Sequence, residues 1–266
     1  NATNLTDGES ISVPGLPEQE IYLATNPLAL ANDIAKLYLA YFDRAPESDG
    51  LQFHIDAASA DMAAGRSYAE ALARRADQFF DAAVAADFSG YSLDQPVAAF
   101  LEMIYTNVLL RPGPGGSAPN ADEIGYWQDR LASGELTRGE IVIEFLEAVD
   151  FLKVMGTPAE QTVAIQVDQV LQNRLTVGLA FSNEQNSNGL VGEAAYNAGK
   201  AALAGVDESQ ASVDAALVSL ATSNSQSTAR ALIDGVFTAP ASEIDATTVD
   251  LTGIVAQPTD DAGGLF

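Results

Sequence analysis

The residues best suited to bind a ligand lie around one glycine-rich stretch, RPGPGGSAPNADEIGYW, residues 111–127. Carboxylate and amide oxygens are the ligands that Ca²⁺ prefers, and Asn120, Asp122 and Glu123 supply three of them within four positions. Asp260 and Asp261 near the end of the chain are a second candidate pair. Neither group has EF-hand spacing or lies in a Gly-Gly-x-Gly-x-Asp repeat. The sequence therefore predicts Ca²⁺ as a candidate cofactor on ligand chemistry alone.

The same stretch contains candidate residues for binding a sugar. Flat aromatic rings suit the faces of sugar rings, so Tyr126 and Trp127, with Arg111 close by, are a candidate glycan-binding group. The alternative is that the aromatic pair packs between helices. Such an exposed loop, rich in glycine and proline, is a common place for function.

No pattern of residues predicts an enzyme. His54 is the only histidine, and no nucleophile and acid accompany it in a catalytic arrangement, so an aromatic packing role is favoured. The glycine-rich loop lacks the lysine of a phosphate-binding P-loop and does not follow a strand. A glycosidase needs two carboxylates, but with 37 acidic residues some pair always lies at a suitable separation.

The charge of the chain limits its partners. Among 266 residues, 37 are acidic and 12 are Lys or Arg, which gives a formal net charge of −25. Nucleic acid is bound by basic patches, so a nucleic-acid partner is not expected. The absence of cysteine excludes disulfides and thiolate metal sites. No apolar run approaches the roughly 20 residues that a membrane-spanning helix needs, so no membrane insertion is expected.

Helical periodicity and helix-start signals dominate the sequence. Pro27 suits the first position of a helix, whose inward face carries Ile34, Leu37, Tyr38 and Tyr41 at three- and four-residue spacing. Capping boxes are predicted where a hydroxyl residue precedes a glutamate by three positions, at Ser67, Thr137 and Thr157. The last one opens a long helix, on which Val163, Val167, Val170, Leu171 and Phe181 are predicted to share the buried face.

The expected fold is all-α, a multi-helix array built from a duplicated helix-turn-helix module with an extended N-terminal arm and C-terminal tail. The arm is predicted over residues 1–25 and the duplicated module over 26–155. A helical C-terminal region follows over 156–238, and residues 239–266 are predicted to be an extended tail or linker.

The duplication is legible as two segments with the same order of residue types. Both have a tyrosine, an arginine six residues later, a turn, an aspartate, an aromatic pair, a glycine, and a hydroxyl residue followed by glutamate. The matched pairs are Tyr38 with Tyr105, Arg44 with Arg111, Asp49 with Asp122, Leu51 with Ile124, Phe53-His54 with Tyr126-Trp127, Gly65 with Gly134, Ser67 with Thr137, and Glu70 with Glu140.

Four charged residues recur at the turns of this repeat: Arg44, Asp49, Arg111 and Asp122. A cation at a helix C-terminus and a carboxylate at the next helix start both complement the helix dipole, so each Arg–Asp pair could lock its turn. The alternative is that the turns present these groups to a glycan or to a bridging Ca²⁺.

This pattern resembles the DUF4214 module, which recurs in bacterial surface and type I secreted proteins, often beside calcium-binding repeats. It is also similar to the N-terminal anchoring region of some surface-layer (S-layer) proteins. The second copy, YWQDRLASGELTRGEIVIEFLEAVDF, matches best, whereas the first has His54 in the tryptophan position and no glycine two residues after its arginine. The resemblance covers roughly residues 30–155, and NRLTVGLAF and AALAGVDESQASVDAAL are similar to helices that follow the module in such proteins.

The resemblance implies an extracellular, cell-surface-associated protein without enzymatic activity. We expect a helical module for anchoring, adhesion or assembly, whose partner is a bacterial surface polysaccharide or another copy of the chain, with Ca²⁺ bridging the acidic surface. The alternatives are an extracellular enzyme that acts on polysaccharide, or its accessory domain, and a passive structural spacer.

Overall fold

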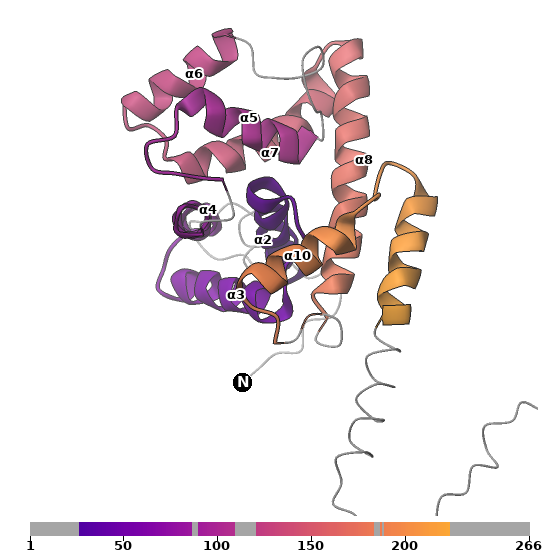
Figure 1. The fold of residues 1–266 in the computed structure, drawn as a ribbon. Coiled ribbons are helices and arrows are strands. Elements are labelled where there is room, and N and C mark those ends of the chain that lie inside the picture. The colour runs from indigo at the N-terminus through magenta and orange to yellow at the C-terminus, as the bar shows by residue number, and fades with distance from the viewer. Residues whose placement is uncertain (1–26, 87–89, 110–120, 184–186, 188, 224–266) are drawn as a thin grey trace, which may run out of the picture. The chain divides into compact units, whose positions relative to one another are not determined.

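A computed structural model describes residues 27–86, 90–109, 121–183, 187 and 189–223, and at 27, 109, 122 and 123 it describes the backbone alone. These residues form α-helices and no strand, as predicted (Figure 1). The helices are α2 (Pro27–Phe42), α3 (Ser48–Ala63), α4 (Tyr68–Ala85), α5 (Val97–Leu109), α6 (Ala121–Ala132), α7 (Arg138–Met155), α8 (Pro158–Phe181) and α10 (Gly192–Leu203), and residues 210–223 are also helical. The predicted arm and tail lie outside the described residues.

The two predicted copies correspond to the triplets α2–α3–α4 and α5–α6–α7. In each triplet a glycine with positive φ lies two residues beyond the end of the second helix, Gly65 at 92° and Gly134 at 72°. A complete capping box then starts the third helix: the Ser67 and Thr137 hydroxyls accept from the backbone N–H of Glu70 and Glu140, whose carboxylates accept in return. The helix starts predicted at these positions are confirmed. The middle helices differ in length, because α3 has 16 residues and α6 has 12.

Helix α2 is the centre of the core and lies against α3, α4, α5, α7 and α8 (Figure 1). Its predicted inward face is confirmed, because Ile34, Leu37, Tyr38 and Tyr41 are all at most 3% exposed. The two triplets meet where α4 packs against α7. There Gly139 is required, because a Cβ on it would lie 2.5 Å from the backbone nitrogen of Asp77.

The helices after residue 155 pack against those before it. Helix α8 lies along α7 and α2, and α10 packs on α8, so the described helices on both sides of residue 155 share one core. Arg174 of α8 is almost fully buried and pairs with Asp43, which follows the last residue of α2 with a positive φ of 51°. The N–H of Ala45 donates to the carbonyl of Gly199 in α10, at 3.1 Å. The α2–α3 turn is thus held by both later helices.

Candidate functional site

The predicted packing role of His54 agrees with its surroundings. Its ring lies 4.4 Å from that of Phe79 and 6.1 Å from that of Tyr38. Burial, followed by the nearby positive charge of Arg75, lowers the pKa of His54 to about 4. The imidazole is therefore neutral near pH 7. Its Nδ1 is buried without a hydrogen-bond partner in the described part of the chain.

The aromatic pair of the second copy is divided between core and surface. Trp127 is 7% exposed and belongs to the core, so its ring face is covered by protein rather than open to a sugar. Tyr126 is 54% exposed, with the guanidinium of Arg130 5.3 Å from its ring centre. Arg130 also donates to the Tyr126 hydroxyl at 2.7 Å. Of the two aromatic side chains predicted to bind glycan, only that of Tyr126 has a free surface.

The turn residues of the first copy form a different ion pair from the expected one. Arg44 pairs with Glu47, the N-cap residue of α3, rather than with Asp49. Arg44 also donates to the carbonyl of Ala45, and its guanidinium lies 4.7 Å from the ring centre of Tyr38. With the residue only 8% exposed, this arginine locks the turn, and Asp49 lies in the first turn of α3.

The remaining predicted site residues cannot be placed. Arg111 and Asn120 lie outside the described residues, as do Asp260 and Asp261, and the side chains of Asp122 and Glu123 in α6 are likewise not described. Among the side chains that the structure does describe, no group of three or more His, Asp or Glu residues fits a metal ion. The Ca²⁺ site therefore stays a prediction from the sequence.

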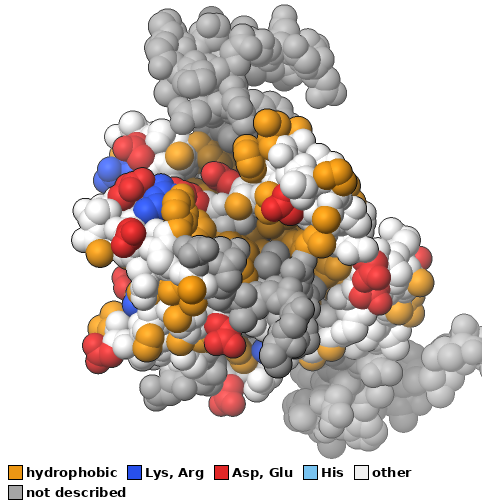
Figure 2. Space-filling model, turned by 90° about the horizontal axis from the view of Figure 1, so that it is seen from above, with side chains coloured by type: hydrophobic (Ala, Val, Ile, Leu, Met, Phe, Trp, Pro, Cys, Tyr) orange, Lys and Arg blue, Asp and Glu red, His pale blue; other side chains and the backbone are white. Residues whose placement is uncertain are grey.

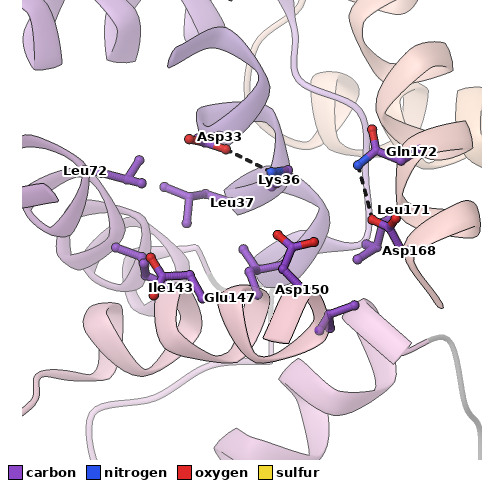
Figure 3. A pocket seen from close by; sticks show the side chains of 12 residues that line it. Asp33, Lys36, Leu37, Leu72, Ile143, Glu147, Asp150, Asp168, Leu171 and Gln172 are labelled. Carbon is purple, nitrogen blue, oxygen red and sulfur yellow. Dashed lines mark hydrogen bonds and ion pairs between the residues drawn. The ribbon is translucent and has the colours of Figure 1, made fainter. Parts of the chain in front are cut away.

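An open cleft of about 250 Å³ lies between α2, α4, α7 and α8 (Figure 3). Its apolar wall includes Leu37, Leu72 and Leu171, from three of these helices. The polar lining residues are Asp33, Lys36, Glu147, Asp150, Asp168 and Gln172. The cleft therefore offers carboxylate acceptors, an ammonium group and an amide above an apolar base, which are groups that can bind a polar organic ligand.

Ion pairs and hydrogen bonds hold most of these polar groups in place. On α2, Lys36 donates to Asp33 at 2.9 Å, and the Tyr68 hydroxyl of α4 donates to the other oxygen of Asp33 at 2.7 Å. Lys153 bridges Asp150 and Asp168 at 2.6 and 2.7 Å, which ties α7 to α8. Gln172 donates to Asp168 at 3.3 Å (Figure 3). The rim of the cleft is thus fixed before any ligand arrives.

Glu147 differs from its neighbours, because none of the described residues forms a hydrogen bond or ion pair with its carboxylate. Its carboxylate sits in the cleft wall, one turn before Phe151 on α7. Burial raises the pKa of Glu147 above its ordinary value, and the negative charges of Glu144, Asp33 and Asp150 raise it further. This carboxylate is therefore available to a ligand that donates a hydrogen bond or carries positive charge.

This cleft could not be predicted from the sequence. Its lining residues come from positions 33 to 172, and each of the four helices contributes between one and five of them. The local signal is a charged or amide pair at helical spacing, such as Asp33 with Lys36 or Asp168 with Gln172, and such pairs are common on exposed helix faces.

No family model, no curated protein and no solved structure matches the chain. The resemblance to DUF4214 proteins therefore rests on the motifs of the two copies. In the described residues, no helix is long and apolar enough to cross a membrane.

Proposed function

We propose that the chain is an extracellular, cell-surface module that anchors or assembles its protein by binding a bacterial polysaccharide in the α2–α4–α7–α8 cleft. The observation that carries this proposal is the cleft itself, in which the Glu147 carboxylate, without a partner among the described residues, faces an open volume of about 250 Å³. The DUF4214-like motifs support the cell-surface assignment.

Sugar chemistry suits the lining of the cleft. Sugar hydroxyls donate to carboxylates, so Glu147 and the free lone pairs of Asp33 and Asp168 can accept from them. Lys36 and Gln172 can donate to ring and hydroxyl oxygens. The C–H faces of a sugar ring pack well against leucine side chains such as Leu72 and Leu171. The excess of carboxylates favours a neutral or amine-bearing sugar over an acidic one.

Binding can be tested on a slide printed with purified bacterial lipopolysaccharides and capsular polysaccharides. We expect the wild-type chain to bind a subset of them, and Glu147→Gln to bind that subset roughly ten-fold or more weakly, since a hydrogen bond to a charged group contributes about 1.5–3 kcal/mol. Glu193→Gln is the matched control, because it makes the same chemical change at another exposed glutamate, on α10, that does not line the cleft. Equal binding by both variants would exclude the cleft as the site.

The enzyme alternative has one observation in its favour. A carboxyl group with a raised pKa beside other carboxylates is what a general acid in glycoside hydrolysis requires, and Glu147 has such surroundings. Release of reducing ends from the bound polysaccharide, abolished by Glu147→Gln, would favour a hydrolase. Binding without release would favour the module.

A further inference from the structure

Two helix hairpins carry clusters of opposite charge. We call the α3–α4 cluster of Asp61, Arg66, Glu70, Arg74 and Arg75 the basic tip. In it, Asp61 accepts from Arg66 at 3.1 Å, from Arg74 at 3.0 Å and from Arg75 at 2.8 Å. Glu70 is the capping-box glutamate of α4 and is also near Arg66.

The α6–α7 hairpin has the reverse arrangement. We call its cluster of Arg130, Glu135, Glu140 and Glu144 the acidic tip. Here Arg130 donates to Glu135 at 2.8 Å and forms a two-pronged pair with Glu144. Glu140 is the capping-box glutamate of α7.

The charges of the two tips are opposite at equivalent positions of the repeat. Asp61 and Arg130 each lie four residues before the positive-φ glycine, and Arg66 and Glu135 each follow it directly. Arg74 and Glu144 each lie four residues after the capping-box glutamate. The two tips therefore have equivalent backbone positions but net charges of opposite sign.

Each tip keeps charge that its own cluster does not neutralise. In the basic tip, three guanidinium groups face two carboxylates, whereas in the acidic tip three carboxylates face one guanidinium. Much of this charge is open to a partner, because the side chains of Arg66 and Arg74 are 45% and 51% exposed and that of Glu135 is 59% exposed. Three of the 12 basic residues of a strongly acidic chain are gathered in one tip.

Both tips lie on the same side of the described helices. In Figure 1 the α3–α4 turn and the α6–α7 turn are both at the left edge. In Figure 2, which shows the molecule from above, most of the blue side chains lie in the left half, among red ones. A second copy brought against this edge after a half-turn places its acidic tip on the first copy's basic tip and its basic tip on the acidic one. A two-fold arrangement therefore satisfies both contacts at once.

We propose that this edge is a self-association surface, on which the basic tip of one copy binds the acidic tip of a second copy. The contact is independent of the cleft and of any polysaccharide. The net charge of −25 opposes association, but at physiological ionic strength charges more than about 8 Å apart are largely screened while direct ion pairs persist. Exposed ion pairs are individually weak, so the two tip contacts must form together, and the two-fold arrangement that allows this sets the orientation of the two copies.

Single cysteines test the orientation, because the chain has none of its own. Ala64→Cys lies beside Gly65 in the basic tip and Ser133→Cys beside Gly134 in the acidic tip, and both positions are exposed. The two variants are mixed in equal amounts and oxidised. One of them carries a tag, so that the mixed dimer and the two homodimers separate on a gel. Random pairing would give twice as much mixed dimer as either homodimer, and we expect the mixed dimer to exceed that two-to-one ratio by several-fold. A statistical distribution would overturn the proposal.

Charge reversal shows whether the tips are responsible. In the Ala64→Cys chain, Arg66→Glu with Arg74→Glu makes both tips acidic, and in the Ser133→Cys chain, Glu135→Arg with Glu144→Arg makes both tips basic. Each reversed chain should lose the excess of mixed dimer with an unreversed partner, and the two reversed chains together should recover it. Recovery also shows that both variants fold. Loss without recovery in chains whose circular dichroism is unchanged would overturn the proposal.

Discussion

Asp61 and Arg130 hold the same position in the two halves of the described helices, with opposite charge. The carbonyl of each closes the helix end by accepting from the residue after the positive-φ glycine, from the N–H of Arg66 at 3.2 Å and of Glu135 at 3.0 Å. Each side chain then reaches across the hairpin to the third helix of its triplet, Asp61 to Arg74 and Arg130 to Glu144. The two hairpins therefore have the same backbone arrangement, but the charges in their ion pairs are exchanged.

This reversal does not make the two residues equally important for stability. Arg75, which also donates to Asp61, has a side chain only 4% exposed, whereas both glutamate partners of Arg130 are at least 33% exposed. We therefore expect Asp61→Asn to lower the free energy of unfolding more than Arg130→Gln does, because a buried guanidinium loses its counter-charge. Urea denaturation followed by circular dichroism measures both, with Asp129→Asn on exposed α6 surface as the control. A larger loss of unfolding free energy for Arg130→Gln than for Asp61→Asn would contradict the greater importance of Asp61 for stability.

Two glycines on neighbouring helices should respond oppositely to the same substitution. A Cβ on Gly199 would overlap the carbonyl oxygen of Ala45, whereas one on Gly178 would meet Pro46 and Ala45 at 3.6 to 3.8 Å, which is ordinary contact. We expect Gly199→Ala to cost about 1–3 kcal/mol through overpacking. Gly178→Ala should be neutral or stabilising by up to about 1 kcal/mol, since alanine is the better helix former. Thermal unfolding of the two variants decides this, and similar losses would contradict the close approach of α10 to the α2–α3 turn.

Local features of this fold could be predicted from the sequence. The three capping boxes at Ser67, Thr137 and Thr157 are all complete, because each depends only on residues three positions apart. The buried face of α8 was predicted in part: Val167, Leu171 and Phe181 are buried, but Val163 is 38% exposed, and its neighbour Ala164 is buried instead. Which of two adjacent residues near the start of a helix is buried depends on the helices that pack against it, and those helices are distant in the sequence.

The candidate site could not be predicted for the same reason. Glu147 and Asp168 lie 21 positions apart on different helices, and only the packing of α8 along α7 brings both to one cleft. Tyr126 and Trp127 were predicted as one group, yet successive helical residues point about 100° apart, so one is in the core and the other on the surface. Sequence spacing indicates the helix but not which of its faces finds a partner.

The predicted Ca²⁺ site gives an expectation for thermal unfolding. A ligand that binds only the folded state stabilises it by mass action, about 2.7 kcal/mol at one hundred times its dissociation constant. After removal of metal with EDTA, millimolar CaCl₂ should therefore raise the melting temperature more than the same concentration of MgCl₂, which controls for ionic screening. Asp122→Asn with Glu123→Gln should abolish the difference. Equal shifts with both salts would show that the acidic residues provide no specific site.

The pH dependence of stability should have two limbs of opposite sign. Burial raises the pKa of Glu147 and of Asp77 above their ordinary values of 4.5 and 3.8. The stability that these two groups contribute is therefore fully present below the ordinary pKa values and is lost as pH rises through the raised pKa values. Capping hydrogen bonds from Ser67 and Thr157 lower the pKa of Glu70 and Glu160. Their contribution is present above 4.5 and is lost as pH falls through the lowered values.

The melting temperature should therefore rise as pH is lowered through the raised pKa values towards 4.5, and should fall as pH drops further through the lowered pKa values. Scanning calorimetry at closely spaced pH values measures both limbs. Glu147→Gln should flatten the upper limb, because the amide does not titrate, and should raise the melting temperature at pH 7 by removing a charge that Glu144, Asp33 and Asp150 repel. Glu193→Gln should leave the upper limb as it is. If the melting temperature of Glu147→Gln changed with pH as steeply as that of the wild type in the upper limb, the carboxyl of Glu147 would not have a raised pKa. The neighbouring negative charges would then not act on it as described.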